Sequence, residues 1–194
     1  MKSLAEIYQN HCSQNAGGDK GTIHSYIEVY EALLAPYREN TNVLEIGIAY
    51  GHSLLMWKDY FVNSNIYGIE IDKPGCDHMK ADPRFEGLHI INENVDNHAE
   101  MLAHLEGINF DVIIDDGSHV LRHQTASYHV LKHKLNPDGI YIIEDVDNID
   151  LWKGTYHAIR DHYQYIDNTK QVDIIDLREI KGRFDDVMVV IQDK

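Results

Sequence analysis

The chain has 194 residues, the usual length of a single domain, and its 17 basic against 32 acidic residues give a formal charge of −15. This acidic balance disfavours nucleic acid as a partner, because binding to a phosphate backbone depends on Lys and Arg. No apolar run reaches the roughly 18 residues needed to cross a bilayer, and the N-terminus lacks the apolar region of a signal peptide. We therefore expect one domain, residues 1–194, in the cytoplasm and without a membrane.

Cysteine and histidine form no clear metal-binding pattern. Cys12 and Cys76 lie far apart and in no metal-ligand spacing, so we expect reduced thiols and no disulfide framework. The 13 histidines are scattered through polar segments, where a solvated or buried neutral imidazole is the simpler interpretation.

Two helices are expected before the first strand. An N-terminal helix is followed by a polar, glycine-bearing loop at 14–21. Apolar residues then recur at helical spacing from Tyr26 to Leu34, with Ser25 as a candidate cap and Pro36 at the exit.

The stretch 42–61 joins a strand, a glycine turn and a helix. Residues 43–46 are a short apolar strand, Gly47 and Gly51 lie in the turn, and a helical pattern follows at once. Glycines let a backbone approach a ligand closely, and a helix start offers unpaired N–H donors, so this arrangement is typical of a nucleotide-like site. The alternative is a tight strand-to-helix turn that binds nothing.

Strands and helices alternate after this turn. Short apolar, β-branched runs at 66–71, 88–92, 111–115 and 139–144 are separated by helical stretches, notably 98–105 and 121–135. This order predicts a doubly wound, Rossmann-like α/β sheet that is mostly parallel. The runs 172–177 and 186–192 are joined only by a glycine-containing loop, too short for a helical crossover, and should form an antiparallel C-terminal hairpin.

Acidic residues mark the strand ends, where such sheets bind ligands. Glu70 follows the glycine turn by about 20 residues, the distance at which a carboxylate can hold both ribose hydroxyls. Asp72 is the neighbouring candidate, and a plain surface acid is the alternative for Glu70. Glu93 and Asn94, after the third strand, are placed to meet the base.

The ends of the fourth and fifth strands bring further carboxylates. Asp115 and Asp116 end one run and Glu144 and Asp145 end the next; if these strands are neighbours, their ends are about 5 Å apart. Carboxylates this close repel one another unless solvent, a proton or a cation reduces the repulsion. If a cation does so, the oxygen ligands suit Mg²⁺, Mn²⁺ or Ca²⁺. Helix caps or hydrated loop acids are the alternative.

His119 lies beside these acids and is a candidate general base. With His123 it forms H-x-x-x-H, but the glutamate that makes a zinc motif informative is absent, so we do not expect zinc.

Several of these segments together resemble one family. The chain is similar to class I S-adenosylmethionine-dependent methyltransferases, specifically the metal-dependent sugar O-methyltransferases of macrolide biosynthesis, of the mycinamicin and demethylmacrocin type. The resemblance runs from about residue 19 to 146, in the segments DKGTIHSYIEVYEALL, LEIGIAYGHSLLMWKDYF, IYGIEIDK, DVIIDDGSHVLRHQ and LNPDGIYIIEDV.

The resemblance implies S-adenosylmethionine and Mg²⁺ (or Mn²⁺ or Ca²⁺) as cofactors and a class I methyltransferase fold. The implied cofactor contacts are Lys20, Thr22, Glu45, Gly47, Gly51, Ser53, Glu70, Asp72, Glu93, Asn94 and Asp115. The implied metal ligands are Asp116, Glu144 and Asp145, and His119 matches the proposed base. Helices within residues 1–40 would form a lid over the cofactor, with Asp19, Lys20, Thr22 and His24 closing the pocket; simple loop ordering is the alternative.

The expected activity is methylation of a hydroxyl on a small-molecule acceptor, a sugar or similar polyol, by an enzyme that forms a homo-oligomer. The chain departs from the family after Val146, where the possible acceptor contacts are Trp152, Tyr156, Tyr163 and Tyr165, which fit a core or a dimer surface equally well. A cofactor-binding protein without transfer activity is the alternative. A nicotinamide-dependent oxidoreductase is disfavoured because the turn lacks G-x-G-x-x-G.

Overall fold

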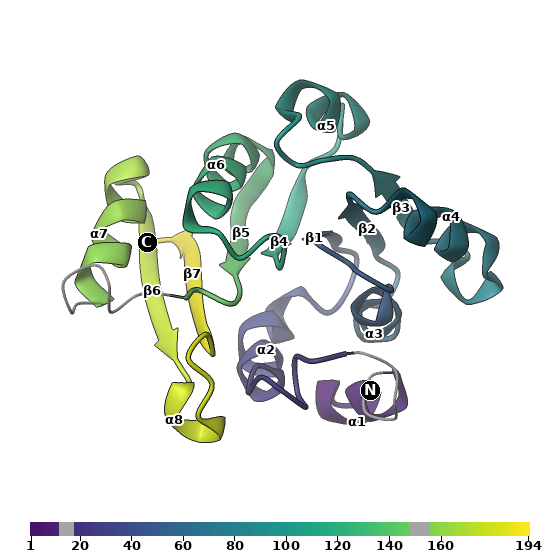
Figure 1. Cartoon of the computed structure of the whole chain (residues 1–194), viewed down its shortest axis with the longest axis horizontal. Helices are drawn as coiled ribbons and strands as arrows, with labels where there is room; N and C mark the ends of the chain where they lie inside the picture. Colours follow the sequence, from purple (N-terminus) through teal and green to yellow (C-terminus); the bar gives the residue numbers. More distant parts are fainter. Residues whose placement is uncertain (12–17, 148–155) are drawn as a thin grey trace.

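A seven-stranded sheet forms the centre of the molecule. The computed structural model describes residues 1–11, 18–147 and 156–194. Within them the strands follow the spatial order β3-β2-β1-β4-β5-β7-β6 (Figure 1). The strand bounds are β1 Asn42–Ile46, β2 Asn65–Glu70, β3 His89–Asn92, β4 Phe110–Asp115, β5 Leu135–Ile143, β6 Lys170–Asp176 and β7 Val187–Asp193.

The first five strands are parallel, and the last two run antiparallel to their neighbours. The predicted doubly wound sheet and C-terminal hairpin are therefore confirmed. The register pairs Ile46 with Asp115 and Asp115 with Ile143, so the carboxyl ends of β1, β4 and β5 lie side by side.

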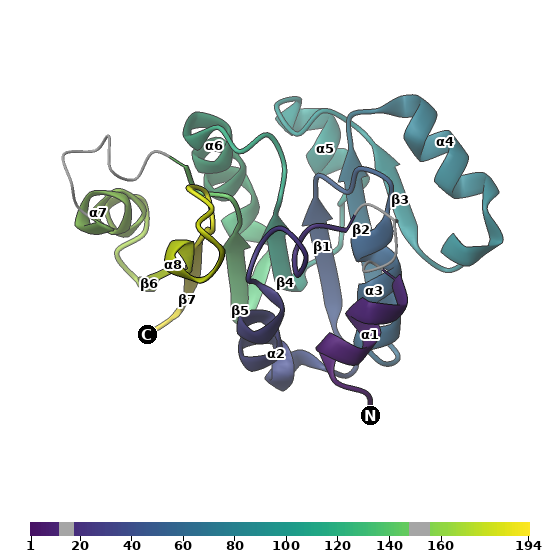
Figure 2. The same cartoon turned by 60° about the horizontal axis from the view of Figure 1, so that its bottom comes forward.

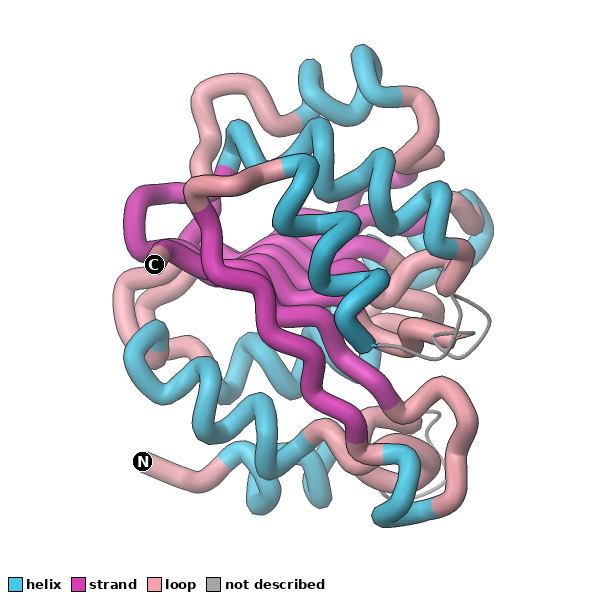
Figure 3. The backbone as a smooth tube through the Cα atoms, turned by 90° about the vertical axis from the view of Figure 1, so that its left-hand side faces the viewer, coloured by secondary structure: helices cyan, strands magenta, loops and turns pink. Residues whose placement is uncertain are grey.

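Helices cover both faces of the sheet, as Figure 3 shows with the strands between two helical layers. The helices are α1 Leu4–His11, α2 Ile27–Leu34, α3 His52–Tyr60, α4 Lys73–Ala81, α5 His98–His104, α6 Leu121–Leu131, α7 Tyr156–Ile166 and the short α8 Arg178–Lys181. Helices α1, α2 and α3 pack together on one face (Figure 2). Within the described residues, no helix has the length and apolar character of a membrane span.

Alternation along the strands divides the core in two. On β4, Val112 and Ile114 join the apolar cluster under α1 to α4, whereas Ile113 joins the cluster under α5 to α7. Successive strand side chains point to opposite faces, so each buried strand supplies both layers, which is why these runs are apolar without interruption.

Three details of the sequence prediction are wrong. Ser25 does not cap α2: Tyr26 holds the N-cap position without a side-chain hydrogen bond, and the Ser25 N–H instead donates to Asp186. The helix expected to reach 135 ends at Leu131, because three 3-10 residues follow and β5 begins at Leu135. The hairpin connection holds α8 as well as Gly182, which ends that helix in a left-handed conformation.

Gly47 permits a close approach between the ends of β1 and β4. Its φ is +77°, and a Cβ there would lie 2.1 Å from the backbone oxygen of Asp116. Gly51 also has a positive φ, at the N-cap of α3. The turn therefore requires glycine for both its conformation and its space.

We predict that Gly47→Ala lowers the free energy of unfolding by about 2–5 kcal/mol, since a left-handed Ala costs about 1–2 kcal/mol and the overlap with Asp116 adds to it. Gly87→Ala is the matched control: its φ is +84°, but nothing lies within 4 Å of the added Cβ. Urea unfolding of both variants would measure the difference. Equal losses would contradict the close approach.

Candidate active site

Two hollows lie at the carboxyl ends of the parallel strands, and they share Gly47, Glu70 and Gly117. The first, about 240 Å³, is bounded by the glycine turn, by residues 18–20 and by Asp116 and His119. The second, about 270 Å³, is bounded by the ends of β1 to β3 and by the loop after β4. Glu70 therefore lies at the junction of a two-part cleft.

Glu70 is held by backbone donors from the glycine turn. Its Oε2 accepts hydrogen bonds from the N–H groups of Ile48 at 3.2 Å and Ala49 at 2.8 Å, and its Oε1 accepts one from Asp72 at 3.0 Å. These bonds fix the carboxylate at the mouth of both hollows. Asp72 has a different role: its carboxylate accepts from Gly75 N–H and caps α4.

The other predicted cofactor contacts divide between the hollows. Ser53 lines the first, where its hydroxyl donates to Glu45 at 2.6 Å. Glu93 and Asn94 line the second hollow. Ser118 and His123 line it as well, although no sequence motif predicted a cofactor contact for either residue. Thr22 is exposed, in the segment before α2; its hydroxyl donates to the Gly18 carbonyl and accepts from the Tyr8 hydroxyl.

Strand alternation brings three carboxylates to one face of the sheet. Glu45 on β1, Asp116 just after β4 and Glu144 just after β5 all fall in phase with the layer that α2 and α3 cover. Ligand oxygens of the three lie within 4.8 Å of one another. The crowding expected from neighbouring strand ends is therefore present.

Lys20 is the buried counterion of this cluster. Its ammonium lies 2.6 Å from Asp116, 2.5 Å from Glu144 and 3.3 Å from Glu45, and its side chain is only 4% exposed. Burial opposes the charge on Lys20, but the three carboxylates outweigh it and raise its pKa well above the ordinary value. Lys20, a predicted cofactor contact, lines the first hollow and is at the same time the counterion of these carboxylates.

The tyrosines of α2 complete the cluster. Tyr30 donates to Glu144, and Tyr26 donates to Asp145 at 2.6 Å. Burial raises the pKa of Glu144 well above its usual range, and Asp116 adds to the shift. No sequence motif marks these two tyrosines as site residues, although their spacing of four residues puts them on one helix face.

His119 lies between Asp116 and Asp145. Its Nε2 is 3.3 Å from Asp116 and its Nδ1 is 3.5 Å from Asp145. The hydrogen bond to Asp116 raises the pKa of His119 to about 9, although partial burial opposes the shift. The structure thus brings together the predicted base and the predicted metal ligands Asp116, Glu144 and Asp145.

Asp115 points to the other face of the sheet. It is buried, and its carboxylate accepts from Gly117 N–H at 3.3 Å and from the Tyr141 hydroxyl at 3.5 Å. Burial raises its pKa to about 7. Asp115 and Asp116 are neighbours in sequence, but only Asp116 belongs to the carboxylate cluster.

The candidate acceptor aromatics lie elsewhere or outside the described residues. Tyr163 is fully buried against Tyr128, and Tyr165 is 90% exposed. Trp152 and the Tyr156 side chain, like Cys12, fall outside the described parts of the chain.

A family model described as a methyltransferase domain matches residues 44–146, more than half of the chain. The chain belongs to this methyltransferase domain family. The match covers the glycine turn, Glu70 and the strand-end carboxylates, which are the parts that build the two hollows.

Named relatives are similar over two thirds of this chain. It is 36% identical over 140 residues to 8-demethyl-8-alpha-L-rhamnosyl tetracenomycin-C 2'-O-methyltransferase of Streptomyces olivaceus, covering 67% of this chain and 35% of that protein. It is also 36% identical over 134 residues to demethylmacrocin O-methyltransferase of Streptomyces fradiae, covering 65% and 33%. The chain thus spans about a third of the length of these relatives.

The fold is also found in solved structures. The structure of MycE methyltransferase from the mycinamycin biosynthetic pathway, in complex with Mg, SAH and mycinamycin VI, superposes with a TM-score of 0.72 at 22% identity, over 99% of this chain and 54% of that one. An O-methyltransferase from Bacillus cereus in complex with SAH gives 0.67 at 15% identity, over 98% and 90%. The class I methyltransferase fold is therefore established for this chain.

We predict that Lys20→Met lowers the free energy of unfolding in metal-free buffer by about 3–5 kcal/mol, because it leaves buried carboxylates without their counterion. Lys73→Met is the control, since Lys73 pairs with Asp77 in solvent and such pairs contribute about 0–1 kcal/mol. Denaturant unfolding of both variants would measure the contrast. A Lys20→Met protein as stable as the Lys73→Met protein would exclude the counterion role.

Proposed function

We propose that the protein transfers a methyl group from S-adenosylmethionine to a hydroxyl of a sugar or similar polyol, with the help of a divalent metal. The observation that carries the proposal is the two-part cleft with Glu70 at its junction and the carboxylates and His119 at one end. The relatives named as sugar O-methyltransferases support it.

The cleft fits a nucleoside joined to an amino acid. In this proposal, Glu70 accepts hydrogen bonds from the ribose hydroxyls at the junction of the hollows, and Glu93 and Asn94 approach the base in the second hollow. The methionine part occupies the first hollow, beside Gly47, Gly51 and Ser53. An adjoining helix N-terminus supplies backbone donors.

The residues at the strand ends fit a hard divalent cation. Asp116, Glu144 and Asp145 offer only carboxylate oxygens, which Mg²⁺ prefers. The buried ammonium of Lys20, which lies against Asp116 and Glu144, supports a preference for positive charge at this end of the cleft. We assign the three carboxylates as ligands of the cation. When bound, the cation would orient neighbouring acceptor hydroxyls and lower their pKa.

The chain's own residues then perform two tasks. The cleft aligns the acceptor oxygen with the methyl carbon and sulfur, because the sulfonium is already a reactive methyl donor. His119, in its neutral form, takes the proton of the acceptor hydroxyl on its imidazole. Asp116 and Asp145 orient the ring, and a cation held by these carboxylates would offset the charge that raises its pKa and so favour the neutral form. The lid segment around Lys20 excludes water from this end of the cleft.

The acceptor is expected to be a small molecule, because the charge of −15 opposes a phosphate backbone. Cytoplasmic location, the lid role of residues 1–40 and the homo-oligomer stay predictions.

The decisive experiment incubates the purified protein with methyl-labelled S-adenosylmethionine, Mg²⁺ and a panel of glycosides. We expect label in an O-methyl product and loss of turnover in EDTA, while calorimetry still detects cofactor binding in EDTA, because the cofactor's own contacts are not metal ligands. Full turnover in chelator would reject the metal role. Cofactor binding without any transfer would favour the non-catalytic alternative, and binding of NAD instead would reject the cofactor assignment.

We predict that His119→Ala lowers kcat about 100- to 10,000-fold, the usual contribution of a general base, with little change in cofactor affinity. The control is His129→Ala, which removes an exposed histidine of α6. Steady-state kinetics and cofactor titration would separate the two effects. Unchanged kcat would remove the base assignment.

A further inference from the structure

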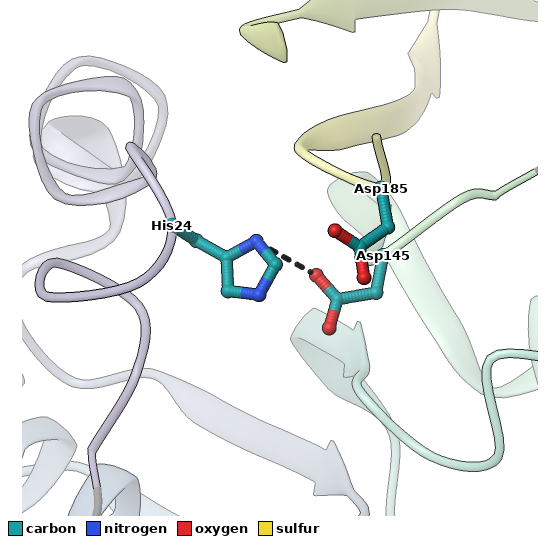
Figure 4. A group of neighbouring side chains, drawn as sticks. All are labelled: His24, Asp145 and Asp185. Carbon is teal, nitrogen blue, oxygen red and sulfur yellow. Dashed lines mark ion pairs between the residues drawn. The ribbon is translucent and has the colours of Figure 1, made fainter. Parts of the chain in front are cut away.

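A second group of metal-ligating side chains surrounds the other oxygen of Asp145. His24 comes from the segment before α2, Asp145 follows β5, and Asp185 lies just before β7 (Figure 4). One ligand atom from each lies within 4.8 Å of the others. Three elements distant in sequence therefore direct a nitrogen and two carboxylates to one point.

Three buried atoms around Asp145 lack hydrogen-bond partners, although Asp145 Oδ1 itself accepts from the Tyr26 hydroxyl at 2.6 Å. His24 is 3% exposed, yet its Nδ1 lacks a hydrogen bond, and the same holds for Oδ1 of Asp185 and Oδ2 of Asp186. His24 Nδ1 lies 3.3 Å from Asp145 and 3.5 Å from Asp186. Buried polar atoms without partners are costly and require an explanation.

Three carboxylates gather here around few cationic partners: besides His24, the ion pairs of the described residues give them Arg183 and His119, and His119 faces only Oδ2 of Asp145, at 3.5 Å. Asp145, Asp185 and Asp186 are all buried, and Arg183 reaches only one oxygen of Asp185, at 2.8 Å. Asp186 Oδ1 is used by the Ser25 N–H at 3.0 Å. A cation at the centre of this group would satisfy the unpartnered atoms and offset the charge together.

We propose that His24, Asp145 and Asp185 bind a divalent transition-metal ion such as Zn²⁺. An imidazole nitrogen with carboxylates suits zinc and its neighbours, whereas Mg²⁺ prefers the all-oxygen group of Asp116, Glu144 and Asp145. Asp145 belongs to both groups because its oxygens diverge: Oδ1 faces His24 at 3.3 Å, and Oδ2 faces His119 at 3.5 Å.

Such an ion would fasten the lid segment to the sheet. The segment carrying Lys20 is already tied to the hairpin connection, because Lys181 donates to the carbonyls of Gly21 at 2.6 Å and His24 at 2.5 Å. Through Asp145 and Asp185, the ion would also connect this segment to the end of β5 and the start of β7. Its role is to hold Lys20 in the carboxylate cluster, and it takes no part in methyl transfer.

The test measures Zn²⁺ binding by equilibrium dialysis in an Asp116→Asn background, which disables the all-oxygen group, without cofactor or acceptor present. We expect one Zn²⁺ per chain, and at least tenfold weaker binding when His24→Asn or Asp185→Asn is added. Adding His129→Asn, at an exposed histidine, should leave the affinity unchanged. Because no turnover is measured, the result is independent of the proposed transferase activity.

Absence of Zn²⁺ binding would overturn the proposal and leave His24 as an ion-pair partner of Asp145 and Asp186. Equal binding by the His24→Asn protein would also overturn it, since the ion would then lie elsewhere. Circular dichroism in EDTA checks that each variant folds. X-ray absorption of the zinc-loaded Asp116→Asn protein reports the ligand types: an imidazole signal that disappears when His24→Asn is added supports the site, whereas oxygen ligands alone, or an imidazole signal that persists, reject it.

Discussion

Buried negative charge at the carboxyl end of the sheet is the constraint on which this structure depends. Glu45, Asp116 and Glu144 lie at or next to the carboxyl ends of the neighbouring parallel strands β1, β4 and β5. All three are on the face of the sheet that α2 and α3 cover. Removing such groups from water is expensive unless each is paired and hydrogen-bonded. Lys20 and Tyr30 supply the pairing, and both come from the N-terminal segment.

That pairing makes residues ahead of the methyltransferase match part of the site. The family model begins at residue 44, but the counterion of its carboxylates lies at residue 20. The same segment is held from its other side by Lys181 and Asp186 of the C-terminal hairpin. The segment before α2 and the connection before β7 therefore meet near the strand ends, so a change in either segment acts on the carboxylates beside them.

Asp115 and Asp116 are adjacent in sequence but differ in pKa, because strand alternation places them on opposite faces of the sheet. Burial without a charged partner raises the pKa of Asp115 to about 7, whereas Lys20 lowers that of Asp116 despite burial. One alternation step along the chain at the end of β4 thus separates an acid that titrates near neutral pH from one that Lys20 keeps ionised. Gly47, which lets the backbone of Asp116 approach the turn after β1, sets the position of the second acid.

The sequence by itself determined the sheet, the glycine turn and the identity of the acids. Apolar strand runs, glycines between a strand and a helix, and carboxylates at strand ends are all local patterns in the sequence. It also placed Glu70, Asp116 and His119 at one edge, since parallel strands share their carboxyl ends. Only the tertiary structure decided the partners: Lys20 among the carboxylates, Tyr26 and Tyr30 against Asp145 and Glu144, and His24 facing Asp185. Most of these contacts join residues about 100 or more positions apart. No rule of sequence spacing connects such segments, because their meeting depends on how helices pack across the completed sheet.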